Sequence, residues 1–107
     1  MEIDQYNIIL VNLDPTVGHE IKKTRPCVVI SPNEMNKYLR TLVIAPMITG
    51  ARQYPTHVPV FHDNKKGQVA LDQVRTIDKQ RVVKVLDVLT RTEILKIKAV
   101  MKETYVD

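Results

Sequence analysis

The chain has 107 residues, 44% of them hydrophobic, which predicts one folded domain spanning residues 1–107. Its formal net charge of +4 is a modest excess that suits a polyanionic partner, while 5% aromatic residues argue against a stacking platform for single strands. One cysteine excludes an intrachain disulfide and a thiolate zinc cluster, and three glycines leave no room for a phosphate-binding glycine loop. No apolar run reaches membrane-span length and the acidic start lacks a signal-peptide core, so we expect a cytoplasmic protein with no membrane contact.

Short apolar runs separated by turn signals predict a β-rich domain. In the first half of the chain they cover residues 8–13, 27–30 and 42–45, and residues 33–39 are expected to form a short helical turn. In the second half they cover residues 58–61, 69–71, 74–77 and 82–89, with a hairpin turn expected over residues 63–67. The regular spacing of these short strands favours a small β-barrel over a sandwich.

The end of the chain follows a different pattern. Thr90 and Glu93 have the spacing of a helix-capping box. Beyond them, apolar side chains recur on one helical face: Ile94, Ile97, Val100, Met101 and Tyr105. We therefore predict an amphipathic C-terminal helix that packs against the barrel.

Charged residues gather in the loop that joins the first two predicted strands: His19, Glu20, Lys22, Lys23 and Arg25. A loop fixed at both ends by core strands is a common place for binding groups, but the same charges also fit a solvated hairpin. Thr49 follows a predicted buried strand, where a threonine is either a β-former or a functional hydroxyl.

Other reactive residue types favour structural roles. Cys27 lies inside an apolar run, as expected for an inert core thiol. The three histidines, His19, His57 and His62, do not have metal-ligand spacing on one element, and no order of Ser, His and Asp suggests a hydrolase triad. We therefore expect neither a metal nor another cofactor.

Three blocks of the sequence resemble the MazF/PemK toxin family. The first combines Val-Gly-His-Glu at 17–20 with Thr-Arg-Pro-Cys-Val-Val-Ile-Ser-Pro at 24–32. The second is Val-Ile-Ala-Pro-Met-Ile-Thr at 43–49, followed by Pro-Thr-His-Val at 55–58. The third is Ala-Leu-Asp-Gln-Val-Arg-Thr-Ile-Asp at 70–78. The blocks keep the family's order and spacing over nearly the whole chain.

The resemblance implies an SH3-like β-barrel of the CcdB/PemK type with a C-terminal helix, acting as a homodimeric toxin that inhibits translation and growth. It implies a metal-independent endoribonuclease that cuts single-stranded RNA, typically mRNA, at short sequences. It also implies a cognate antitoxin, acidic and partly disordered. The family motifs assign catalysis to Arg25 and Thr49, and substrate binding or support to a wider set: His19, Glu20, Lys22, Lys23, Gly50, Gln73 and Arg75.

The chain departs from the family pattern at three places. Tyr6-Asn7 replaces a common Gly-Asp pair, His19 replaces a small polar residue, and Gly50 follows Thr49 where a Ser, Thr or Ala is frequent. Either Glu20 or His19 could be the general base, and we hypothesise that His19 modulates that proton transfer. Two rival functions stay open at this level: a CcdB-like toxin that binds DNA gyrase without catalysis, and a barrel that only holds RNA.

Overall fold

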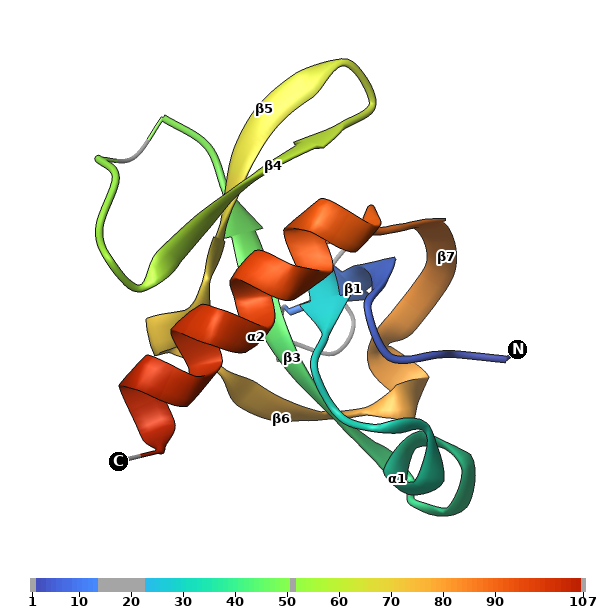
Figure 1. Cartoon of the computed structure of the whole chain (residues 1–107). Coiled ribbons are helices and arrows are strands. Elements are labelled where there is room, and N and C mark those ends of the chain that lie inside the picture. The colour runs from blue at the N-terminus through green and yellow to red at the C-terminus, as the bar shows by residue number, and fades with distance from the viewer. Residues whose placement is uncertain (1, 14–22, 51, 107) are drawn as a thin grey trace.

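The computed structural model describes residues 2–13, 23–50 and 52–106. Its elements, in chain order, are β1 (Asn7–Asn12), β2 (Thr24–Val29), α1 (Asn33–Tyr38), β3 (Thr41–Ile48), β4 (His57–His62), β5 (Lys65–Ala70), η1 (Leu71–Gln73), β6 (Arg75–Asp78), η2 (Lys79–Arg81), β7 (Val82–Val88) and α2 (Arg91–Tyr105). Figure 1 shows a curled sheet with α2 lying across one face and the β4–β5 hairpin extending from one end. The expected architecture, mainly β with a C-terminal helix, is confirmed; the sheet forms a half-barrel.

The strands are joined in antiparallel pairs in the order β4-β5-β3-β2-β1-β7, and β6 also pairs with β3. Ile44 of β3 pairs with Val29 of β2 and with Arg75 of β6, so β2 and β6 lie on opposite edges of β3. β5 and β6 therefore share one edge of β3, one after the other, with η1 as the bend between them. This shared strand curls the sheet into a half-barrel.

Apolar residues alternate along the central strands and bury both faces of the sheet. Ile8 and Val28 belong to the cluster beneath α2, together with Ile97 of the helix. Ile9 and Cys27 belong to a second cluster. A sheet buried on both faces explains why the strands read as continuous apolar runs rather than as alternating ones.

The predicted capping box at the start of α2 is confirmed: Thr90 Oγ1 accepts from the Glu93 N–H at 3.2 Å and Glu93 Oε1 accepts from the Thr90 N–H at 2.9 Å. The predicted apolar face holds except at its end, where Tyr105 is 54% exposed. Its hydroxyl nevertheless donates to the Leu71 carbonyl at 2.5 Å, so the last turn is fixed by a hydrogen bond rather than by burial.

Two sequence-based boundaries in the hairpin region were wrong. The turn contains only Asp63 and Asn64, both with positive φ, and the following lysines already belong to β5. Asp and Asn tolerate this conformation, and two such residues make the tight turn that suits a twisted hairpin. Leu71 is the first residue of η1 and not the end of a strand.

Tyr6 adopts φ of +69°, a left-handed conformation that favours glycine. It is the first residue of the Tyr6-Asn7 pair at which the sequence departs from the family pattern that it resembles. The Tyr6 N–H donates to the Val29 carbonyl at 2.8 Å, and the Tyr6 carbonyl accepts from the Leu89 N–H at 3.1 Å. These two hydrogen bonds stabilise the turn before β1, although the residue with positive φ is Tyr6 and not a glycine.

Candidate active site

A gap in strand pairing creates the site. β2 pairs with β3 only from Cys27 to Val29, whereas the far end of β3 pairs with β5 through Met47 and Ile48. If the β2–β3 register continued, Arg25 would lie opposite Ile48, next to Thr49. Because the two strands separate there instead, side chains from both can face one opening.

This opening is a cleft of about 550 Å³. The body of the sheet contributes Thr24, Arg25, Pro26, Met47, Ile48 and Thr49, and β7 contributes Leu86. The hairpin contributes His62, Asp63, Lys65, Lys66 and Gly67. Arg25 and Thr49, which the sequence motifs singled out as a pair, therefore line the same cleft.

The charges around the cleft favour an anionic ligand. Among the described residues, Arg25, Lys65 and Lys66 are exposed cations that line it, against one carboxylate, Asp63. An arginine guanidinium offers a planar fork of donors that matches phosphate oxygens, and lysines act as point charges. The two lysines could not be predicted as binding residues, because the sequence places them in a turn with no known neighbour. Only the sheet topology brings them to the same cleft as Arg25.

Cys27 is fully buried beneath the cleft and is no nucleophile. Burial raises the pKa of its thiol to about 12, although the nearby cations Arg25 and Arg75 act in the opposite direction. The thiol also lies 3.6 Å from the Arg25 carbonyl, to which it donates a weak hydrogen bond. At neutral pH it stays protonated, as expected for a core thiol.

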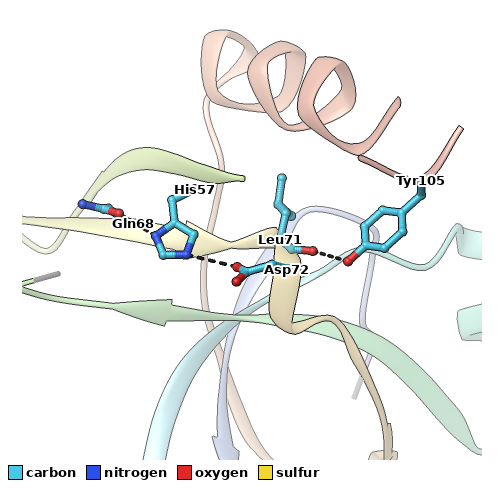
Figure 2. A network of polar contacts seen from close by, with 5 residues as sticks. All are labelled: His57, Gln68, Leu71, Asp72 and Tyr105. Carbon is cyan, nitrogen blue, oxygen red and sulfur yellow. Dashed lines mark hydrogen bonds and ion pairs between the residues drawn. The ribbon is translucent and has the colours of Figure 1, made fainter. Parts of the chain in front are cut away.

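The buried His57 belongs to a separate network of polar contacts (Figure 2). Its Nδ1 lies 2.9 Å from Gln68 Oε1 and its Nε2 lies 3.0 Å from Asp72 Oδ1. The Tyr54 ring meets the imidazole edge to face at 5.2 Å between centroids. This network joins β4, β5 and η1, and none of its members lines the cleft.

The other predicted binding residues that the structure describes do not line the cleft. Lys23, Gly50, Gln73 and Arg75 are exposed but are not among the residues that line the cleft. Gly50 has φ of +69°, which a side chain would strain, so it provides the turn after Thr49. His19, Glu20 and Lys22 lie outside the described residues. In the described part of the chain no three His, Cys, Asp or Glu side chains form a potential metal site, and no helix is both long and apolar enough to cross a membrane.

Solved structures show what class of fold this is. MazF from Deinococcus radiodurans superposes with a TM-score of 0.78 at 23% identity, covering 96% of this chain and 96% of that one. An endoribonuclease from a mycobacterial species, in complex with its cognate antitoxin, gives a TM-score of 0.80 at 20% identity and covers 94% and 92% of the two chains. The half-barrel with a C-terminal helix is thus the fold of MazF toxins.

Sequence comparison gives the family. Residues 4–105 match the family of PemK-like, MazF-like toxins of type II toxin–antitoxin systems. Endoribonuclease MazF of Staphylococcus epidermidis is 30% identical over 97 residues, which is 85% of this chain and 81% of MazF. Endoribonuclease PemK of Escherichia coli is 33% identical over 82 residues, which is 72% of this chain and 62% of PemK. The chain belongs to this toxin family, as the sequence motifs indicated.

Proposed function

We propose that this chain is the toxin of a type II toxin–antitoxin system and acts as an endoribonuclease on single-stranded RNA, inhibiting translation and growth. Family membership and the activity named for the two curated relatives support the reaction class. The single observation that carries the proposal is the presence of Arg25 and Thr49 in one cation-lined cleft.

The cleft suits RNA cleavage without a metal because the nucleophile belongs to the substrate. The 2′-oxygen attacks the adjacent phosphorus, and the products are a 2′,3′-cyclic phosphate and a 5′-hydroxyl end. In the transition state extra negative charge builds on the phosphate oxygens, where the Arg25 guanidinium and the Thr49 hydroxyl donate hydrogen bonds. Preorganised donors aimed at developing charge are commonly the largest catalytic contribution. Candidates for the base, His19 and Glu20, remain predictions outside the described residues.

The proposal includes partners. A homodimer in the cytoplasm would act on mRNA, and an acidic antitoxin segment would bind the same cations that bind RNA. The mycobacterial endoribonuclease was solved in complex with its cognate antitoxin, which supports an antitoxin for this chain. Lys23, Gln73 and Arg75 are exposed and remain candidates for contacts with RNA or with a second copy. A gyrase-binding role is not favoured, because both curated relatives are named endoribonucleases.

The decisive experiment incubates the purified chain with a mixed RNA pool in EDTA and sequences the cleavage ends. We expect fragments with 5′-hydroxyl ends at one short sequence. Arg25→Ala should lower the cleavage rate about 10²–10³-fold or more, the cost of losing a donor to the transition state. Arg91→Ala, an exposed arginine at the start of α2, is the matched control and should cleave like the wild type. Intact RNA together with inhibited gyrase would support the rival function instead.

A further inference from the structure

One histidine shares the cleft with Arg25 and Thr49. His62 is the last residue of β4, and its side chain is 16% exposed. Its Nδ1 is buried and makes no hydrogen bond among the described residues, but Asp87 Oδ2 lies 3.4 Å away, within ion-pair distance. Because Nδ1 is buried, a proton exchanged between this ring and a ligand in the cleft would have to pass through Nε2.

Asp87 is held so that one carboxylate oxygen faces this imidazole. Its Oδ1 accepts a hydrogen bond from the Val88 N–H at 2.8 Å, which leaves Oδ2 toward His62. Along the β1–β7 pair, Ile8 lies opposite Asp87 and Ile9 lies opposite Val85, so β7 contains one extra residue, Leu86. Such bulges redirect side chains and are frequent beside active sites.

The strand that carries His62 is fixed as well. The N–H of Phe61, the preceding residue, donates to Glu93 Oε2 at 2.9 Å, and Glu93 Oε1 is held by the capping box. The end of β7 and the start of α2 thus anchor both members of the pair. A catalytic group needs this kind of support to keep its geometry.

We propose that His62 is the general acid of RNA cleavage and that Asp87 is the residue that positions it. The inference rests on the proposed endoribonuclease function and adds to it the group that protonates the leaving oxygen. An imidazole suits this task because its ordinary pKa, about 6.5, lets both protonation states exist near neutral pH. In a protonated ring both nitrogens are donors, so Nδ1 can face the carboxylate while Nε2 donates to the leaving oxygen.

The 2′-hydroxyl loses its proton to a base, water in the simplest case, and the 2′-oxygen forms a bond to phosphorus. The bond between phosphorus and the 5′-oxygen breaks, and its electron pair stays on that oxygen. The 5′-oxygen takes a proton from Nε2 of the imidazolium, which leaves a 5′-hydroxyl and a neutral ring. The ring regains its proton from solvent.

Other charged groups line the same cleft as His62. Among the described residues they are Arg25 on β2, Lys65 and Lys66 on β5, and Asp63 in the turn. The three cations can bind an RNA phosphate beside the imidazole.

The test compares two substrates of the mapped cleavage sequence: ordinary RNA, and the same RNA with sulfur in place of the 5′-bridging oxygen at the cut. A thiolate leaves without protonation because a thiol is a much stronger acid than an alcohol. We expect His62→Gln to lose about 10²–10⁴-fold on ordinary RNA and to come within several-fold of the wild type on the sulfur substrate. Arg25→Ala should be slow on both, because it stabilises the phosphate rather than the leaving group.

Each alternative outcome is distinct. If His62→Gln cleaves ordinary RNA at the wild-type rate, or is equally slow on both substrates, His62 is not the acid, while the nuclease proposal stands. If the wild type cleaves neither substrate, the nuclease proposal itself fails. Unchanged circular dichroism and melting temperature of the variant confirm that folding is not the cause.

Asp87→Asn tests the positioning role and serves as a second variant should His62→Gln not fold. Without the carboxylate the charged ring loses its partner, so the alkaline limb of the kcat pH profile should move to lower pH. Glu103→Gln, an exposed acid on α2, is the matched control and should leave the profile unchanged. An Asp87→Asn profile that overlays the wild type would overturn the assignment of Asp87.

Discussion

The two ends of β4 carry two histidine–aspartate pairs that differ in almost everything except composition. At the first residue of the strand, the His57 side chain is 4% exposed and both its ring nitrogens have oxygen partners. At the last residue, the His62 side chain is 16% exposed and the residue lines the cleft. The His57 imidazole has no hydrogen-bonding capacity left, whereas the role that we propose for His62 needs Nε2 to donate to a substrate.

The difference shows that a histidine beside a carboxylate is not by itself a catalytic feature. His57 and Asp72 join β4 to η1, and Figure 2 shows the ring held between Gln68 and Asp72, with Tyr105 reaching Leu71 close by. The partners of His57 are all internal. The His62 pair differs because His62 lines the same cleft as Arg25 and Thr49.

Removing His57 from its contacts with Gln68 and Asp72 should give the largest change in the free energy of unfolding. We expect His57→Ala to lower the free energy of unfolding by about 1–3 kcal/mol, because Gln68 and Asp72 lose their shared partner. Cleavage by the folded variant, measured well below its melting temperature, should stay within a few-fold of the wild type. Urea denaturation and the RNA assay together check this. A large loss of activity in a fully folded variant would contradict the conclusion that the His57 end of β4 has a structural role only.

Removing the helix cap that supports the His62 end of β4 should lower the free energy of unfolding by a smaller amount. Thr90→Ala removes the N-cap of α2 and should destabilise the protein by about 1 kcal/mol. For a domain of this size that corresponds to a fall of roughly 4–8 °C in Tm. Thr92→Ala changes the exposed second residue of α2 and is the control; it should melt near the wild-type temperature. Equal melting temperatures for the two variants would show that the capping box contributes nothing measurable.

The smallest expected effect concerns the contribution of the cleft lysines to RNA binding. Lys65→Ala and Lys66→Ala should each lower the slope of log Kd against log salt by about 0.7, as expected for one lost contact to a single-stranded phosphate. The measurement uses an RNA with a 2′-deoxy nucleotide at the cut, which binds without being cleaved. Lys96→Ala and Lys98→Ala on α2 are matched controls, and a slope that falls as much in them would argue against RNA in this cleft.

The strands and the C-terminal helix could be predicted from the sequence because their signals are local. The capping box of Thr90 and Glu93 and the apolar runs of the central strands depend on neighbours within a few residues. The prediction that Arg25 and Thr49 act together came only from the family motifs. No periodicity could have shown that β2 and β3 stop pairing at Cys27 and Pro46, since strand pairing joins residues far apart in the chain.

The hairpin side of the site could not be predicted for a similar reason. His62 looked like one of three scattered histidines, and Lys65 like a turn residue. Their placement depends on a two-residue turn with positive φ and on a bulge in a strand far along the chain. Bulges have no strong sequence signal, so the approach of Asp87 to His62 required the structure.

The hydrogen bond from Phe61 to Glu93 has a consequence for solubility. β4 ends the sheet order, and an unpaired edge strand is a template for aggregation. The alternate N–H groups that point away from β5 are each accounted for: His57 donates to the Tyr54 carbonyl, Pro59 has no N–H, and Phe61 donates to the Glu93 carboxylate. A second chain approaching this edge finds no donor at these three positions and meets a negative charge, so the edge is protected against strand-to-strand association.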